Sequence, residues 1–487
     1  MVISKNYRPA PAYINLSDSI DEGAPFYDKV VPADFPQGKL RFRNNEWASH
    51  IGLDTVSDAK WMRFFRDFEP LPDNFPTPIA VRYHGHQFRH YNPDIGDGRG
   101  FLYAQLRDDQ DRLLDLGTKG SGQTPYSRSG DGRLTLKGGV REVLATQMLE
   151  ALGVYTSKSF SLIETGESLH RNDEPSPARS AVLVRLSHSH VRFGVFQRLA
   201  FEKNAQAIER LGDYCIDNFY PRLSGTTGDD RVLGLYQEII TQSARLVGQW
   251  MAAGFVHGVL NTDNLNVTGE SFDYGPWRFV PTADPGFTAA YFDQTGLYSY
   301  GRQGEAVGWN LSQLGGALSL LVSPDALTKC LQTYPRHYEK SMADAFFARL
   351  GLACDDENTA SHAGLVMDLL KVMALKGAPF EQTFFDLYGG KLSERRINSS
   401  KYNELYQGAE FATVIGRLYA LTPAKNASKT LEHPYFAGSS PCTMLIDEVE
   451  NIWSHIADDD DWAPFQAKLA QIGHLQEAYG HQASHWA

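Results

Sequence analysis

The chain has 487 residues, of which 42% are apolar and 21% are charged, and its formal net charge is −12. This length is enough for one large domain with two lobes or for several ordinary domains, and the composition is that of a soluble globular protein. The negative charge excludes general binding to nucleic acid or to anionic membranes, because both depend on a basic surface. A polyanionic ligand therefore needs a local cluster of arginine and lysine.

The cysteines, the N-terminus and the hydropathy exclude further classes. Four cysteines are far apart and form no CxxC pair, so neither a zinc ribbon nor a disulfide framework is expected. Residues 1–25 lack the apolar core of a signal peptide, and no apolar run approaches the roughly 20 residues of a membrane span. We therefore expect a cytoplasmic protein with reduced thiols, which uses neither a membrane nor nucleic acid as partner.

The first part of the chain is predicted to be an extension laid over a core. Residues 1–75 are interrupted by prolines and contain short helical stretches near residues 47–51 and 58–68. From residue 80, short apolar runs alternate with glycine-rich turns, which is typical of strands and loops. Strands are predicted at residues 101–106, 113–119 and 181–186, and a helix over residues 139–152 that ends at Gly153.

Beyond about residue 195 the pattern becomes mainly helical. Residues 235–253 carry apolar side chains at helical spacing and stop at Gly254, and further helices are predicted within residues 311–422 and 442–483. A strand-rich half followed by a helical half predicts an α+β fold of two lobes. A ligand cleft is expected at the junction, since small-molecule sites favour such places.

The stretch His257–Gly275 holds the candidate metal and catalytic residues. Asp263, Asn264 and Asp273 are the oxygen-bearing side chains that Mg²⁺-dependent nucleotide chemistry uses. If the chain turns back at Thr268-Gly269 as a tight hairpin, Asn264 faces Asp273, close enough for both to bind one metal ion. Asp263 would then lie beside the ion and accept the proton of an attacking hydroxyl. The alternative is a surface hairpin with solvated side chains.

Two glycine-rich segments upstream are candidates for binding phosphate. In Gly96–Gly100, the glycines let the backbone approach a ligand and Arg99 offers a planar anion contact, although an ordinary glycine turn between strands is the alternative. Residues 120–133 form a long loop rich in glycine, hydroxyl and arginine residues, whose N–H groups can hold phosphate. It is not a Walker A loop, because no Gly-Lys-Ser/Thr occurs there.

Cationic side chains complete the inventory. Strand alternation places Lys119 on the face opposite Leu116, and Glu142 on the following helix is suited to hold it, as in kinase-like sites. A solvent-facing glutamate is the alternative. Arg185 and Arg192 flank a His-Ser-His turn and could clamp a polyphosphate, or could pair with surface carboxylates.

These residues together resemble the selenoprotein O family of pseudokinase-fold protein adenylyltransferases. The resemblance covers about residues 26–321. It implies a protein-kinase-like fold with a strand-rich N-lobe and a helical C-lobe, which binds ATP in a flipped orientation and transfers AMP to Ser, Thr or Tyr hydroxyls of proteins. The motifs that carry it are Tyr83–Phe88, Gly96–Arg99, Lys119–Arg133, Arg141-Glu142, Arg192–Gly194, His257–Asn264, Asp273–Pro276 and Trp309–Leu311.

The resemblance implies a role for each matching residue. Asp263 would be the proton acceptor, Asn264 and Asp273 would bind Mg²⁺ or Mn²⁺, and Glu142 would hold Lys119. The implied lobes are residues 76–195, with the nucleotide loops, and 196–487, with the metal and catalytic loop. The implied ATP contacts are Gly96, Gly98, Arg99, Lys119, Asp131, Gly132, Arg185, Arg192 and Asp273.

The chain also departs from the family pattern. Leu136–Gly139 replaces an Arg-Ser-Ser-like run, Phe88-Arg89 replaces Phe-Gly, the region after about residue 400 matches poorly, and no terminal selenocysteine or cysteine pair can be placed. Two other functions stay open on the residues alone. They are a kinase-like phosphotransferase and a nucleotide-binding scaffold without turnover.

Overall fold

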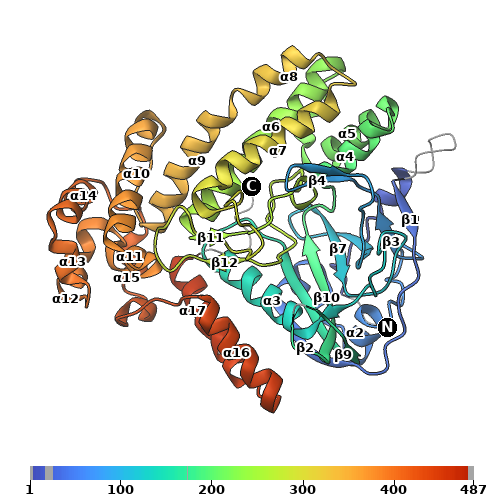
Figure 1. Ribbon diagram of the computed structural model, residues 1–487, viewed down its shortest axis with the longest axis horizontal. Coiled ribbons are helices and arrows are strands. Elements are labelled where there is room, and N and C mark those ends of the chain that lie inside the picture. Colours follow the sequence, from blue (N-terminus) through green and yellow to red (C-terminus); the bar gives the residue numbers. More distant parts are fainter. Residues whose placement is uncertain (1–3, 17–25, 173, 481–487) are drawn as a thin grey trace.

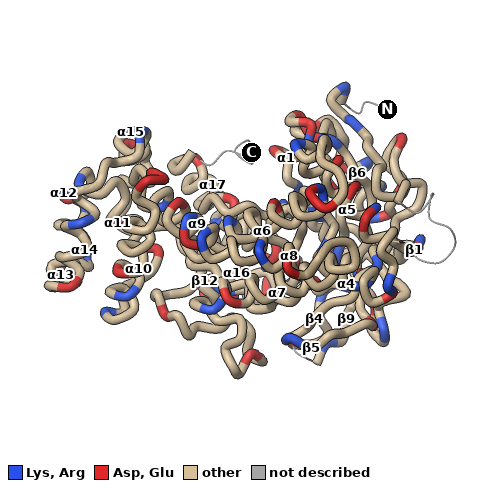
Figure 2. The backbone as a smooth tube through the Cα atoms, turned by 90° about the horizontal axis from the view of Figure 1, so that it is seen from above, with Lys and Arg blue, Asp and Glu red and all other residues tan. Residues whose placement is uncertain are grey.

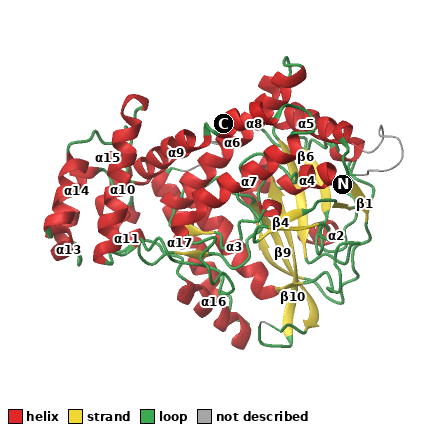
Figure 3. Ribbon diagram, turned by 45° about the horizontal axis from the view of Figure 1, so that its top comes forward, coloured by secondary structure: helices red, strands yellow, loops and turns green. Residues whose placement is uncertain are grey.

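The computed structural model describes residues 4–16, 26–172 and 174–480. Strands gather in one half of the molecule and helices make up most of the other (Figures 1 and 3). The fold is mixed α and β, with a large antiparallel sheet and many helices. This agrees with the predicted α+β class.

The sheet has eight strands in the order β1-β3-β6-β7-β10-β9-β2, with β8 paired to β10. Strands β1 (Tyr27–Lys29) and β2 (Lys39–Arg43) form its two edges. Both come from the N-terminal extension, so this segment is part of the sheet as well as a cover over it. The other strands are β3 (Ile79–Val81), β6 (Leu102–Arg107), β7 (Leu113–Lys119), β8 (Leu134–Thr135), β9 (Lys158–Leu169) and β10 (Ala178–Ser187).

Helices α1 (Asn45–His50) and α2 (Asp58–Phe65) cover one face of the sheet, where two short helices were predicted. Their aromatic side chains share an apolar cluster with Leu114 and Leu116 of β7. Because successive side chains of a strand point to opposite faces, Lys119 points away from this cluster. The predicted orientation of Lys119 relative to the leucines is therefore confirmed.

Helix α3 (Leu136–Ala151) packs against β9 and β10 and ends just before Gly153, which has a φ of +79°. A Cβ atom on Gly139 would lie 2.4 Å from the Leu162 side chain of β9, so a larger residue there would have to displace that side chain or the helix. The close approach brings Glu142 of α3 within reach of the end of β7. The predicted helix and its end are confirmed.

The helical half is built around α6 (Gly228–Ala252), which contacts α7 (Gln303–Leu318), α8 (Pro324–Leu331) and α9 (Tyr334–Arg349). The helix ends before Gly254, as its sequence predicts. The other helices of this half are α4 (Phe193–Phe201), α5 (Ala205–Phe219), α10 (Thr359–Lys376), α11 (Phe380–Leu387), α12 (Glu394–Ser399), α13 (Asn403–Gln407), α14 (Ala409–Tyr419) and α15 (Ala427–Leu431).

The last two helices, α16 (Ile446–Asp459) and α17 (Ala463–Tyr479), return to the strand-rich half and contact α3 (Figure 1). Asp460, between them, forms ion pairs with Arg41 of β2 and Arg179 of β10, each at 2.8 Å. Hydrogen bonds from Arg179, Trp462 and Lys39 hold the pKa of Asp460 well below its usual range. Ion pairs thus join the segment between the last two helices to the sheet that carries Lys119.

Lys, Arg, Asp and Glu positions are interspersed along the whole backbone (Figure 2). In the described part of the chain, no helix combines the length and the apolar character that crossing a membrane requires. Because charges of both signs are mixed along the backbone, a polyanion site must be sought in local clusters of Lys and Arg.

Candidate active site

A cleft of about 640 Å³ collects residues that are far apart in the sequence. It lies where the two glycine-rich segments, the end of β7 and the loop between β11 (Phe255–Val256) and β12 (Arg278–Phe279) meet. Asp263 lines it. The residues predicted to contact ATP line it as well: Gly96, Gly98, Arg99, Lys119, Asp131, Gly132, Arg185, Arg192 and Asp273.

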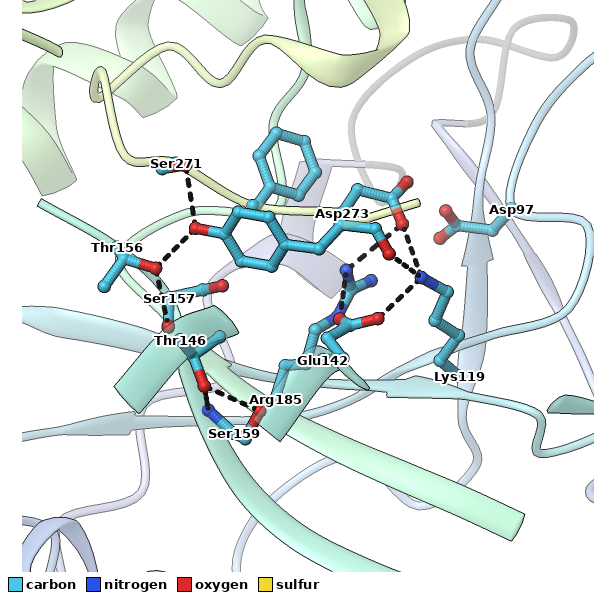
Figure 4. A network of polar contacts seen from close by, with 12 residues as sticks. Asp97, Lys119, Glu142, Thr146, Thr156, Ser157, Ser159, Arg185, Ser271 and Asp273 are labelled. Atoms are coloured by element: carbon cyan, nitrogen blue, oxygen red, sulfur yellow. Dashed lines mark hydrogen bonds and ion pairs between the residues drawn. The ribbon is translucent and has the colours of Figure 1, made fainter. Parts of the chain in front are cut away.

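Lys119 and Glu142 form a buried ion pair beneath this cleft. Their Nζ and Oε2 atoms are 2.7 Å apart, and the residues are 5% and 1% exposed (Figure 4). This burial excludes a solvent-facing Glu142. Arg185 approaches the other oxygen of Glu142 at 3.4 Å, so one carboxylate positions two cations of the cleft.

Asp273 is surrounded by three cations. Lys119 Nζ and Arg185 Nη1 lie 3.1 and 3.4 Å from its Oδ1, and Arg192 Nη1 lies 2.9 Å from its Oδ2. Burial alone would raise the pKa of Asp273, but these cations hold it well below its usual range. Asp273 is therefore ionised at neutral pH, and all three cations that surround it line the cleft.

Asp263 has the opposite environment. It is 7% exposed, and its Oδ1 has no hydrogen-bond partner among the described residues. Burial raises its pKa to about 6; Arg192 opposes this rise and Asp273 adds to it. A carboxylate with a pKa near neutrality suits a general base, because it is ionised yet basic enough to take a proton.

Arg192 connects the two aspartates. Its Nη1 donates to the backbone oxygen of Asp263 at 2.8 Å as well as to the carboxylate of Asp273. The Arg192 guanidinium therefore contacts the carboxylate of Asp273 but only the backbone of Asp263. No lysine or arginine among the described residues forms an ion pair with the Asp263 carboxylate.

The predicted hairpin is wrong. The turn exists, since Gly269 has a φ of +67° and its N–H bonds to Asn266, but the two arms do not pair with each other. Residues 265–267 instead bond to residues 191–193, and Ser271 bonds to residues 155–157. The loop is buried between these two segments, and they satisfy its backbone groups in place of a local partner.

Asn264 ends the short 3₁₀ helix η3 (Thr262–Asn264) and does not line the cleft. Its Nδ2 donates to the backbone oxygen of Val259 at 3.0 Å, which leaves Oδ1 as the atom able to bind a metal. The described residues contain no group of three His, Cys, Asp or Glu side chains arranged for a metal ion. A carboxylate and an amide oxygen are donor types that Mg²⁺ accepts, but of the two residues only Asp273 lines the cleft.

Some cleft residues were missed by the sequence reasoning. Asp97 is buried, accepts the Val81 N–H at 3.0 Å, and lies 3.6 Å from both Arg192 and His190. Asp97 belongs to the motif Gly96–Arg99, but the motif gives no sign that this residue is buried. Asp97 faces Nη2 of Arg192, whereas Asp273 contacts Nη1.

The mouth of the cleft adds further cations. Arg171, from the loop after β9, lines the mouth and pairs with Asp131 at 2.8 Å. The sequence showed only a polar loop at this position. Arg99 and Arg128 are exposed there and form no ion pair within the described ranges. A polyphosphate would thus meet cations at the mouth as well as at the base.

Comparisons with known proteins identify the family of the chain. The family model described as "Protein adenylyltransferase SelO" matches residues 13–473, so the match continues well past residue 321 and includes the region after residue 400. The protein nucleotidyltransferase YdiU of Synechocystis sp. is 42% identical over 462 residues, which are 92% of this chain and 96% of that protein. The YdiU protein of Trichormus variabilis is 44% identical over 498 residues, covering 97% and 96%. The chain therefore belongs to the SelO family of protein adenylyltransferases.

Proposed function

We propose that this enzyme transfers AMP from ATP to Ser, Thr or Tyr hydroxyls of other proteins and releases pyrophosphate. One observation carries the proposal: Lys119, Arg185 and Arg192 converge in one cleft beside Asp263, whose pKa is raised to about 6. The cleft thus offers cations for a leaving pyrophosphate next to a base for an attacking hydroxyl. Membership of the SelO family supports the same reaction.

We further propose a protein-kinase-like arrangement of two lobes. The strand-rich lobe comprises residues 76–195, joined by edge strands from residues 1–75, and the helical lobe comprises residues 196–487. Two features support this assignment. A lysine at a strand end pairs with a glutamate of the next helix, and the loop with Asp263 and Asp273 meets them at the cleft.

The cations have a defined task in such a transfer. The acceptor oxygen bonds to the α-phosphorus, the bond from that phosphorus to the bridging oxygen breaks, and pyrophosphate leaves with the bonding electrons. Two unit charges 4 Å apart near a protein surface interact by about 4 kcal/mol. Lys119, Arg185 and Arg192 would stabilise the charge that develops on the leaving group, and Arg99 would bind phosphate at the mouth.

Asp263 would take the proton of the acceptor hydroxyl. Its Oδ1 is buried and has no hydrogen-bond partner among the described residues, so this oxygen can receive the proton. Asp273 and Asn264 would hold Mg²⁺ or Mn²⁺, which supplies positive charge to the phosphates when bound. We also infer a cytoplasmic setting, because the four cysteines are all free thiols.

The position of a radioactive label tests the proposal. The enzyme is incubated with Mg²⁺ or Mn²⁺, a mixture of acceptor proteins, and ATP labelled at either the α- or the γ-phosphate. We expect protein to retain only the α label, and Asp263→Asn to abolish retention. Retention of only the γ label would identify a phosphotransferase, and binding of ATP without retention of either label would identify a scaffold.

A further inference from the structure

A second cavity, of about 420 Å³, lies apart from the active-site cleft and shares none of its lining residues. It is enclosed by the turn between β6 and β7, the end of α5 with the segment that follows, one face of α6, and the loop around Thr268. Its size is within the range of sites for small organic molecules. We call it the rear pocket.

The rear pocket contains an arginine without a counterion. Arg245 of α6 forms no ion pair with any described residue, and its Nε is buried without a hydrogen-bond partner. Its guanidinium lies 5.2 Å from the centre of the Tyr155 ring, and burial lowers its pKa. The other arginines of the pocket are paired, Arg112 with Asp108 at 2.6 Å and Arg222 with Glu238. Arg245 is only partly buried, and a cation at this place with no acidic partner among the described residues can take an external anion.

Two acidic residues in or next to the rear pocket are not counterions for Arg245. Glu270 accepts the N–H of His188, a lining residue, at 2.9 Å. Burial raises the pKa of Glu270 to about 8, so this carboxyl is mostly protonated at neutral pH. Asp111 lines the pocket but pairs with Arg8. The positive charge of Arg245 is thus left for an external anion.

One part of the lining is aromatic. Tyr155, Phe219 and Tyr220 are each less than a tenth exposed and line the pocket, together with His188. Burial lowers the pKa of His188 to about 3, so this ring is neutral. Aromatic rings beside an arginine with no acidic partner among the described residues favour a ligand that combines a planar ring with an anionic group. The rest of the lining is polar: Gln110, Asn218, Gln242 and Thr268 can form hydrogen bonds with such a ligand.

We propose that the rear pocket binds a small organic oxyanion, with its phosphate or carboxylate on Arg245 and its ring between the aromatic side chains. The pocket also borders the catalytic loop, because Thr268 lines it and the Tyr220 hydroxyl donates to the backbone oxygen of Val267 at 2.6 Å. The site does not depend on the reaction proposed above. Its ligand is recognised by residues that the cleft does not use.

Calorimetric titration tests the proposal. Phenyl phosphate and benzoate serve as probes, and the cleft is first saturated with a non-hydrolysable ATP analogue so that neither probe can bind there. We expect saturable binding of one molecule of at least one probe in the millimolar range or tighter. The preferred probe identifies the ligand as a phosphate or a carboxylate. Absence of saturable binding by both probes would overturn the proposal.

Two variants assign the binding to Arg245. Arg245→Met keeps an unbranched apolar stem but removes the guanidinium, and it should weaken binding at least tenfold. Gln242→Glu, three residues earlier on α6 and also in the pocket, supplies an internal carboxylate for Arg245; it should abolish binding and raise the melting temperature. Arg417→Met, at an exposed arginine paired with Asp368, is the control and should bind as the wild type does. Unchanged affinity in folded Arg245→Met would refute the site.

Discussion

The raised pKa of Asp263 predicts that this residue costs stability. A carboxyl whose pKa is higher in the folded than in the unfolded state favours folding when protonated and opposes it when ionised. A rise from the ordinary value of 3.8 to about 6 corresponds to about 3 kcal/mol, at about 1.4 kcal/mol for each tenfold change in proton affinity. Asp263→Asn should therefore abolish transfer and yet stabilise the protein at pH 7 by up to about 3 kcal/mol.

The size of the stability gain in Asp263→Asn depends on pH. The cost of the ionised carboxylate develops as the pH rises from 3.8 to about 6, so the gain in Asp263→Asn should be full at pH 7 and should vanish below about pH 4. Urea denaturation at pH 7.5 and at pH 4 measures the free energy of unfolding, and the α-label assay measures transfer. A gain that persists at pH 4 would show that shape, not charge, is responsible.

Asp273→Asn is the matched control, because it is the same substitution ten residues later in the same loop. The pKa of Asp273 is held well below its usual range by Lys119, Arg192 and Arg185, so its charge contributes stability above about pH 4 that is lost as the pH falls. Asp273→Asn should therefore destabilise the protein at pH 7 while also abolishing transfer. If both variants shifted stability in the same direction at pH 7, the electrostatic reasoning would be refuted.

Three further outcomes are expected. Glu142→Gln leaves Lys119 and Arg185 buried with less negative charge, so it should lower the free energy of unfolding by about 3–5 kcal/mol and weaken ATP binding, measured by urea denaturation and calorimetry; unchanged stability would contradict the buried pair. The initial rate of transfer at saturating ATP should rise with pH and level off above an apparent pKa of about 6, because only ionised Asp263 accepts a proton; a rate independent of pH between 5 and 7 would exclude this base. Chelation by EDTA should stop transfer without changing the melting curve, since the described residues form no closed metal cage; unfolding on chelation would indicate a structural metal.

Local patterns predicted the parts of the fold that depend on neighbours in the sequence. Alternation along β7 was enough to place Lys119 opposite Leu116, and glycines marked the ends of α3 and α6. The hairpin prediction for the loop after Asp263 was wrong because the partners of this loop are not its neighbours in the sequence. Its backbone bonds to residues 191–193 and 155–157, which are remote in sequence, so a local hairpin was the wrong choice among possible partners.

In the candidate site, too, the sequence predicted residue types but not contacts between remote segments. Chemical type and order singled out Lys119, Asp263 and Asp273, which now share one cleft. Burial and distant pairing could not be read in this way. Asp97 shows no sign of burial in its glycine-rich motif, and the pairing of Arg171 with Asp131 joins two loops that look merely polar.

The difference in pKa between Asp263 and Asp273 depends on which of their groups the Arg192 guanidinium contacts. Asp263 and Asp273 belong to the same loop and have the same intrinsic acidity, yet one pKa is raised to about 6 and the other falls well below 3.8. Burial acts on both, so it cannot separate them. Direct cation contacts do, because Arg192 meets the carboxylate of Asp273 but only the backbone of Asp263. Environments that push two carboxyl pKa values apart distinguish a base from a permanently charged group, and this difference supports Asp263 as the proposed proton acceptor.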